Sequence, residues 1–204
     1  MKAGKEKQHQ KKPLFIIGID EVGRGPLAGP VMVCAAALEV GKKISLIENG
    51  VKLNDSKKLT PKSREKWAEK LKETGVPFAI SSVSPAVIDK INVSNAANLA
   101  ARRSLRKLFA EHGITPSGSV IFLDGGLYAP GGKTVIGADR KIKAVMAASI
   151  LAKVKRDKHM RKISSKYPEY GFDKHKGYGT KVHMAAIKKY GLSPIHRKTF
   201  CRSV

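Results

Sequence analysis

The chain is poor in cysteine and in long apolar runs. It holds two cysteines, Cys34 and Cys201, among 204 residues, too few for a disulfide framework or a cysteine-based zinc site. Its longest apolar runs, such as residues 31–38, fall far short of the ~20 residues that cross a bilayer. Residues 1–12 are basic and polar and lack the apolar core of a signal peptide. We therefore expect a cytoplasmic protein.

Acidic residues are also scarce. The chain has 16 Asp and Glu against 40 Lys and Arg, which gives a formal charge of +24. A surface of that sign attracts polyanions, and phosphate backbones are the commonest of these. A solubility or extremophile bias, or a structural protein of the ribosome, would produce the same excess. The charge therefore favours nucleic-acid binding without indicating what is done to the nucleic acid.

The pattern of apolar residues predicts a single α/β domain. Hydrophobic residues make up 42% of the chain, enough for one core. Apolar, β-branched runs predict strands over residues 14–19, 31–38, 78–83, 120–123 and 133–137. Helical patterns cover residues 61–74, a short segment from 84, and residues 94–111, 140–164 and 181–190. We expect a basic disordered tail over 1–13 and one domain over 14–204, with a helical appendage from about residue 165.

Three details of this pattern are specific enough to test. Thr60 followed by Pro61 predicts a capped helix start. The segment 41–58 lacks a clear period and is predicted to be mostly loop. Alanines at positions 144, 147, 148 and 152 indicate that the helix over 140–164 packs closely against the sheet.

Acidic side chains follow three of the predicted strands. Asp20 and Glu21 end the first strand, Asp124 ends the fourth and Asp139 follows the fifth. Sites in open α/β sheets gather where strands end. Carboxylates that converge there repel one another unless cations neutralise them, and their oxygens suit Mg²⁺ or Mn²⁺. Two such ions about 4 Å apart can activate a water and stabilise the leaving oxygen in phosphodiester cleavage.

Each acid also has a simpler interpretation. Asp139 could cap the helix predicted to begin after it, and Asp124 could be an ordinary turn residue before two glycines. Asp20 and Glu21 have no comparable explanation, but neighbours in a regular strand point to opposite faces. A twist at Glu21, next to the turn at residues 23–25, would let both acids face one site.

Other motifs are incomplete. Residues 23–28 fit the dinucleotide fingerprint, but Pro26, Pro30 and a strand follow where a helix must begin. Residues 132–134 resemble the end of a phosphate-binding loop, but Leu127 stands where its first glycine is required. The six histidines show no His-Glu-x-x-His spacing. These patterns do not support a dinucleotide, Walker A or histidine-zinc site.

Several blocks, in order over about residues 14–200, resemble the ribonuclease HII family, the bacterial type 2 RNases H. They are residues 18–30 (GIDEVGRGPLAGP), 53–59 (LNDSKKL), 123–125 (LDG), 147–154 (AASILAKV) with Arg156-Asp157, 170–172 (YGF), 175–180 (HKGYGT) and 194–197 (PIHR). The resemblance implies an RNase H-like fold, with a five-stranded mixed sheet flanked by helices and a small C-terminal helical part.

The resemblance also implies an activity. It is that of an endonuclease that hydrolyses RNA in RNA–DNA hybrids and nicks 5′ of single ribonucleotides in duplex DNA, leaving 5′-phosphate and 3′-OH ends. The implied partner is such a hybrid or duplex, with no membrane and no obligate protein partner. The alternative is a non-catalytic nucleic-acid-binding module on the same fold.

Roles for individual residues follow from the same resemblance. The family's metal-binding acids fall on Asp20, Glu21, Asp124 and Asp139, which would hold two Mg²⁺ or Mn²⁺ ions with substrate. Asp157, inside a helix, is expected to make a structural or phosphate-network contact instead.

The resemblance further implies how the substrate is read. The family's Gly-Arg-Gly motif falls on Gly23, Arg24 and Gly25, where the backbone can approach the ribose 2′-OH. Tyr178 falls where a tyrosine stacks on the deoxyribose at the RNA–DNA junction, although an aromatic cap over a glycine turn is the alternative. Candidates for contacts with the nucleic-acid backbone are Lys57, Lys58, Lys143, Lys153, Lys176 and Arg197.

Overall fold

The centre of the molecule is a five-stranded mixed sheet in the order β5-β2-β1-β6-β7. A computed structural model describes residues 14–42, 47–48, 51–52 and 59–202. β1 (Phe15–Val22) and β2 (Val31–Glu39) are antiparallel, as are β2 and β5 (Phe78–Val83). On its other side β1 runs parallel to β6 (Ser119–Asp124), and β6 runs parallel to β7 (Gly132–Val135). The predicted sheet is confirmed.

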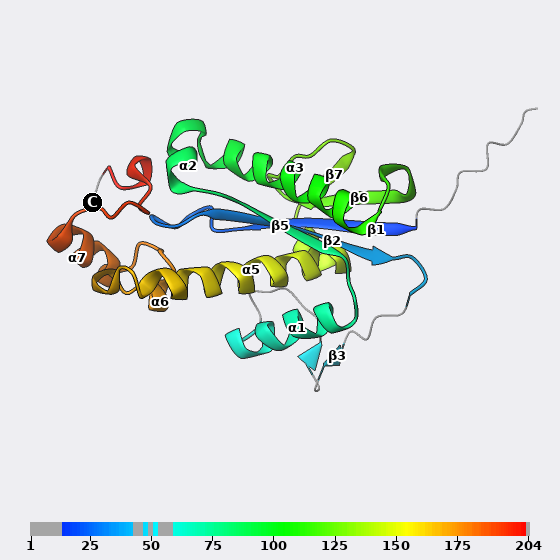
Figure 1. Cartoon of the computed structure of the whole chain (residues 1–204), viewed down its shortest axis with the longest axis horizontal. Helices are drawn as coiled ribbons and strands as arrows, with labels where there is room; N and C mark the ends of the chain where they lie inside the picture. The colour runs from blue at the N-terminus through cyan, green and yellow to red at the C-terminus, as the bar shows by residue number, and fades with distance from the viewer. Residues whose placement is uncertain (1–13, 43–46, 49–50, 53–58, 203–204) are drawn as a thin grey trace, which may run out of the picture.

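Helices cover both faces of the sheet (Figure 1). One face carries α2 (Pro85–Ile91) and α3 (Val93–His112), and the other carries α5 (Lys143–Ser164). α1 (Pro61–Glu73) packs on the outer side of α5. Its predicted start is confirmed, since the Thr60 side chain accepts a hydrogen bond from the Ser63 N–H and Pro61 opens the helix.

The C-terminal segments lie beyond the end of α5, beside the turn that joins β1 to β2 (Figure 1). They are η2 (Pro168–Tyr170), α6 (Phe172–His175), α7 (Lys181–Tyr190) and η3 (Lys198–Phe200). They form a core of their own around Tyr170 and Phe172, into which Ala28 of the turn is also packed. The turn is therefore covered by the part of the chain that comes last.

The segment 41–58, predicted to be mostly loop, includes two short paired strands, β3 (Ile47–Glu48) and β4 (Val51–Lys52). One predicted helix differs from the structure. The helix predicted over residues 140–164 is two helices, α4 (Ala138–Lys141) and α5, because Ile142 is extended. The cap position of α4 is Gly137, so the interpretation of Asp139 as a helix cap is wrong.

Some of the predictions lie outside the described residues. These are the basic tail over 1–13 and the two candidate phosphate contacts Lys57 and Lys58. Among the residues that the structure does describe, no helix combines the length and the apolar character needed to cross a membrane.

α5 lies against β1 at backbone distance. A Cβ added to Gly18 would lie 2.1 Å from the carbonyl carbon of Ala144 and 2.1 Å from the amide nitrogen of Val145. Ala144, Ala147, Ala148 and Ala152 are all buried on this helix. The predicted close packing is confirmed, and it fixes the height of α5 above the strand that ends in Asp20.

Replacing Gly18 by alanine should destabilise the fold, because the new methyl group meets backbone rather than a movable side chain. We expect a loss of roughly 3 kcal/mol or more in the free energy of unfolding, at the upper end of overpacking effects. Denaturant unfolding measures it. Gly118→Ala is the matched control, since its methyl would lie 3.3 Å from the Thr115 hydroxyl oxygen. Equal losses in the two variants would contradict the backbone contact.

Candidate active site

A cleft of about 280 Å³ opens at the end of β1. It is lined by Asp20, Glu21, Val22, Gly23, Arg24, Gly25, Arg64, Asp124, Ser149, Lys153 and Tyr178. Three of the four predicted acids, the Gly-Arg-Gly turn, the predicted tyrosine and one predicted lysine therefore meet at one place. Residues that are far apart in the sequence reach it from β1, β6, α5 and the C-terminal part.

Asp20 and Glu21 reach the cleft from opposite faces of the sheet. β1 stays in regular register with β2 up to Val22, so the predicted twist at Glu21 is absent. Asp20 lies on the α5 face, where the Ser149 side chain hydrogen-bonds it. Glu21 lies on the α3 face, next to Arg24. β6 pairs with β1 only as far as Ile19, so among the described residues this edge of β1 is unpaired beside Asp20 and Glu21.

The carboxyl group of Asp20 is buried and strongly perturbed. Asp20 is only 5% exposed. Burial raises the pKa of Asp20 to about 8, and the neighbouring charges of Glu21 and Asp124 add to the rise. The hydrogen bonds from Ser149 and from the Glu21 N–H, at 2.8 Å, oppose it without cancelling it. A cation bound nearby would favour the charged form of this carboxyl group.

Glu21 offers an oxygen without a protein partner. Burial raises the pKa of Glu21, the positive charge of Arg24 lowers it, and the charge of Asp124 raises it again. Oε1 lies 3.4 Å from Nη1 of Arg24. The buried Oε2 has no hydrogen-bond partner among the described residues. A buried acceptor left open beside two other carboxylates fits a bound cation.

Asp139 lies behind the cleft rather than on its wall. Its backbone N–H donates to Oδ1 of Asp124 at 3.4 Å, so the two residues are adjacent. Its own carboxylate is buried, 3.8 Å from Nε of Arg140. Within the described ranges, no three His, Cys, Asp or Glu side chains are placed so that they could ligate one ion together. Three of the predicted acids therefore line the cleft. The fourth, Asp139, is in contact with one of them, Asp124.

Arg197 fixes the turn that follows the acids. Its guanidinium donates to three carbonyl oxygens, those of Gly23, Arg24 and Gly29, at 2.5, 2.7 and 3.0 Å. Its residue is 0% exposed. Burial, then repulsion from Arg156, lowers the pKa of Arg197 to about 10, so it stays charged at neutral pH. The prediction that Arg197 contacts the nucleic-acid backbone is not supported, because its donors are used inside the protein.

Arg156 joins the same turn to the segment that carries Tyr178. Its guanidinium donates to the carbonyls of Pro30, Lys176 and Ala28 at 3.0, 3.1 and 3.2 Å. A Cβ at Gly23 would lie 2.3 Å from its Nε. Only glycine leaves room for this arginine, and Gly23 also has a φ of 90° that favours glycine.

Tyr178 faces the turn across the cleft. It is 41% exposed. Its ring atom Cε1 lies 4.0 Å from where a Cβ on Gly25 would stand, and it is the one atom that close among the described residues outside the immediate chain neighbours. The N–H groups of Leu27 and Ala28 both point to the carbonyl of Gly177, at 2.8 and 3.3 Å. The tyrosine segment and the glycine turn are therefore bonded to each other directly.

Of the predicted lysines that the structure describes, one lines the cleft and two do not. Lys153 lines the cleft and is held by Asp157 at 2.9 Å, which gives Asp157 the structural contact expected of it. The ammonium group of Lys176 bonds to the carbonyl of Asp173, outside the cleft lining. Lys143 opens α5 and is likewise absent from the lining.

Three polar residues at or beside the cleft were not predicted from the sequence. Ser149 bonds to Asp20 and Arg64 lines the wall. Ser94, at the start of α3, accepts a hydrogen bond from Arg24 at 2.9 Å. Ser149 lies inside a block that resembles the ribonuclease HII family, which was the available signal. Arg64 and Ser94 carry no sequence signal of this kind.

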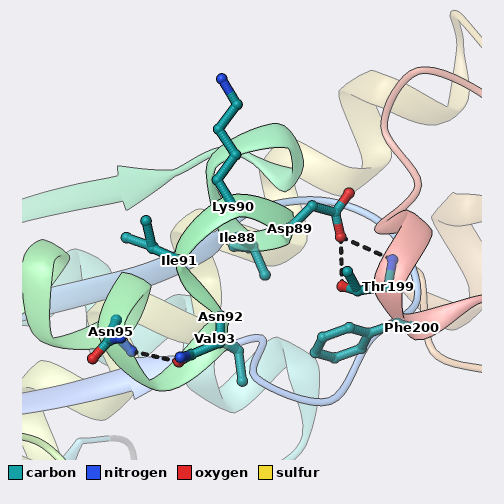
Figure 2. A pocket seen from close by; sticks show the side chains of 9 residues that line it. All are labelled: Ile88, Asp89, Lys90, Ile91, Asn92, Val93, Asn95, Thr199 and Phe200. Carbon is teal, nitrogen blue, oxygen red and sulfur yellow. Dashed lines mark hydrogen bonds between the residues drawn. The ribbon is translucent and has the colours of Figure 1, made fainter.

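A second cavity, of about 590 Å³, lies between α2, the start of α3 and η3 (Figure 2). Its one acid, Asp89, accepts hydrogen bonds from the N–H groups of Lys198 and Thr199 and from the Thr199 hydroxyl. Those bonds lower the pKa of Asp89 despite partial burial. Asp89 thus anchors η3, and the cavity lacks the convergent acids of the cleft.

The raised pKa of Asp20 predicts how the metal-free protein responds to pH. Folding disfavours the charged form, so stability falls as pH rises from the unfolded value of 3.8 to about 8. Asp20→Asn removes this loss, which is up to roughly 5 kcal/mol. In EDTA, the melting temperature of the variant should exceed that of the unchanged protein at pH 8 and approach it at pH 5. The exposed Glu111→Gln is the control, and parallel pH curves for Asp20→Asn and the unchanged protein would refute the assignment.

The chain is similar to known proteins over nearly its whole length. The family model for ribonuclease HII matches residues 17–203. The ribonuclease HII of Caldicellulosiruptor bescii is 45% identical over 193 residues, which are 93% of this chain and 88% of that protein. The crystal structure of ribonuclease H2 from Pyrococcus horikoshii superposes with a TM-score of 0.72 at 29% identity, covering 91% of this chain and 93% of that one.

A more distant structure shows the same fold with a metal. Bst-RNase HIII, in complex with Mn²⁺, has a TM-score of 0.67 at 22% identity, over 90% of this chain and 65% of that one. The match of the family model over nearly the whole chain, together with the identity to the curated relative, shows that this chain belongs to the ribonuclease HII family.

Proposed function

We propose that the cleft at the end of β1 is the active site of a divalent-metal-dependent endonuclease. Membership of the family makes the chain a ribonuclease H, which cleaves RNA in RNA–DNA hybrids. The proposal adds the site, the metal and the preference for a nick 5′ of a single ribonucleotide. The observation that carries it is the group of three carboxylates around Asp20, in a protein whose formal charge is +24.

Asp20, Glu21, Asp124 and Asp139 are the proposed metal ligands. Asp20 lies between the charges of Glu21 and Asp124, and Asp139 bonds to Asp124 through its backbone. Carboxylate oxygens favour Mg²⁺ or Mn²⁺, and the Mn²⁺ of Bst-RNase HIII supports that choice. Two bound ions would supply an activated water and stabilisation of the leaving 3′-oxygen. These four residues would hold the ions beside the scissile phosphate.

Lys153 and Arg24 are the proposed phosphate contacts. Lys153 lines the cleft, and Asp157 holds its ammonium group in place. Arg24 also lines it, a third exposed and oriented by Glu21 and Ser94. Lys176 and Lys143 remain proposed contacts of a longer duplex outside the cleft. Lys57, which lies outside the described residues, stays a proposal from the family resemblance alone.

The turn at Gly23, Arg24 and Gly25 is the proposed reader of the ribose. Among the described residues, only the Tyr178 ring lies within 4.0 Å of where a Cβ on Gly25 would stand, which supports a close approach of a sugar to this backbone. A 2′-OH is the group that distinguishes RNA from DNA there. Tyr178 would stack on the adjacent deoxyribose, which fits a flat ring better than a ribose does.

The rival function is a non-catalytic module that binds hybrids. Such a module needs the positive surface but has no use for a buried carboxyl group with a pKa of about 8. The acids of the cleft therefore favour the enzyme.

Cleavage of a DNA duplex that holds one ribonucleotide tests the function. We expect a nick on its 5′ side with Mg²⁺ or Mn²⁺ and none with EDTA. Asp124→Asn should lower the rate by at least about 100-fold, because it removes a charge that holds the metal, and should leave duplex binding within a few-fold. Glu111→Gln, an exposed acid-to-amide change on α3, is the matched control. A nick that persists in EDTA, or normal turnover of Asp124→Asn, would contradict the proposal.

Removing the Tyr178 ring tests the stacking role. Tyr178→Ala should lower the ratio of junction cutting to cutting within a uniform hybrid by about tenfold, a typical value for one stacking contact. Tyr178→Phe keeps the ring and should keep the ratio. Rates on the two substrates under single-turnover conditions give the measurement, and an unchanged ratio in the alanine variant would count against stacking.

A further inference from the structure

Three histidines lie under Tyr178, and the proposed mechanism uses none of them. His175 and His183 stack with ring centroids 4.4 Å apart, and His196 lies 5.2 Å from His183. Phe172 contacts all three rings. Their elements, α6, α7 and the segment before η3, make up the C-terminal part that covers the turn.

Hydrogen-bond partners fix which nitrogen of each ring carries the proton. The Ser193 backbone N–H, which can only donate, lies 2.9 Å from Nδ1 of His196. A neutral His196 therefore carries its proton on Nε2. That nitrogen lies 3.0 Å from Nε2 of His183, which must accept. His183 is then protonated on Nδ1, and this N–H points to the carbonyl of Tyr178 at 2.9 Å.

The chain of donors has one direction and ends at Tyr178. Burial lowers the pKa of all three histidines, that of His183 to about 4, so the rings are neutral at neutral pH. Nδ1 of His196 also lies 2.8 Å from the Ser193 hydroxyl and 3.4 Å from the Ser193 carbonyl. The Ser193 N–H, at 2.9 Å, is the contact that a proton on Nδ1 would oppose. The arrangement is thus consistent with one tautomer of each ring.

The backbone of Tyr178 is held on both sides. Its N–H donates to the carbonyl of His175 at 3.0 Å, and its carbonyl accepts from the Thr180 N–H at 2.8 Å as well as from His183. Its ring, in contrast, is 41% exposed and has the Arg156 guanidinium 5.9 Å from its centroid. The position of the ring over the cleft therefore depends chiefly on how the backbone is anchored.

We propose that His183, in the tautomer set by His196, is a positioning residue for Tyr178 and thereby for recognition of the RNA–DNA junction. The inference rests on the proposed stacking of Tyr178. It assigns to His183 no contact with substrate. His183 supplies one hydrogen bond, from its Nδ1–H to the backbone carbonyl of Tyr178.

Two amide variants separate the two nitrogens of His183. The amide of His183→Asn corresponds to Nδ1 and can still donate to Tyr178, whereas the longer His183→Gln corresponds to Nε2 and can meet His196. We expect His183→Gln to lower the junction-to-hybrid ratio by up to about tenfold, the effect of losing one of the two hydrogen bonds to the Tyr178 carbonyl. His183→Asn should stay within about threefold of the unchanged protein. Melting temperatures should fall in both. His112→Gln, at the exposed end of α3, is the control.

The outcomes distinguish this inference from the proposed function. Equal ratios in His183→Asn and His183→Gln would show a purely structural role and overturn the inference. A lowered ratio in Tyr178→Ala with an unchanged ratio in His183→Gln would overturn the inference alone. An unchanged ratio in Tyr178→Ala would overturn the stacking role and the inference together.

Nitrogen-15 spectra of the imidazole rings give a test that does not depend on activity. At neutral pH, His183 should be protonated on Nδ1 and His196 on Nε2, each as one tautomer. His196→Gln, whose amide can still donate toward His183, should preserve the His183 tautomer. Reversed or mixed tautomers in the unchanged protein would overturn the inference.

Discussion

Two buried guanidinium groups join the turn after β1 to the segment that carries Tyr178. Arg156 and Arg197 donate to six backbone carbonyls, and those carbonyls belong to the turn after β1 and to Lys176 near Tyr178. A buried carbonyl without a donor costs about 1–3 kcal/mol, so the loss of either arginine would release several at once. The turn, the end of α5 and the C-terminal part are placed relative to one another by these bonds. The C-terminal helices are thus part of the site's construction.

The cleft gathers negative charge in a basic protein, and the bonds of the two arginines keep its shape. The acids at the end of β1 are few in a basic chain, they repel one another, and burial raises the pKa of Asp20 to about 8. Such an arrangement lowers the stability of the metal-free fold at neutral and higher pH. It persists because Gly18 lets α5 lie against the strand and because the sheet is well buried on both faces. Strain of this kind is typical of sites that bind cations.

The sequence was most informative where structure is local. β5 and α7 were predicted to the residue, and the Thr60 cap was correct, because apolar period and cap chemistry act over a few residues. The predictions were wrong where the structure of a segment depends on residues far away in the sequence. Ile142 is no helix breaker, so the break before α5 was not visible. Arg197 was named as a candidate contact with the nucleic-acid backbone, but it is buried and donates to carbonyls of the turn after β1. Among the described residues, the unpaired edge of β1 beside Asp20 and Glu21 depends on where β6 stops, which no pattern within β1 encodes.

The bonding between the glycine turn and the tyrosine segment has a consequence for the thermodynamics of binding. Leu27 and Ala28 point their N–H groups at Gly177, and Arg156 spans the same two segments. The distance between Gly25 and the Tyr178 ring is therefore set before any duplex arrives. A preorganised pair of this kind loses little conformational entropy on binding. With the proposed function, the energetic cost of fitting would fall on the nucleic acid, and its local deformability would become part of what is recognised.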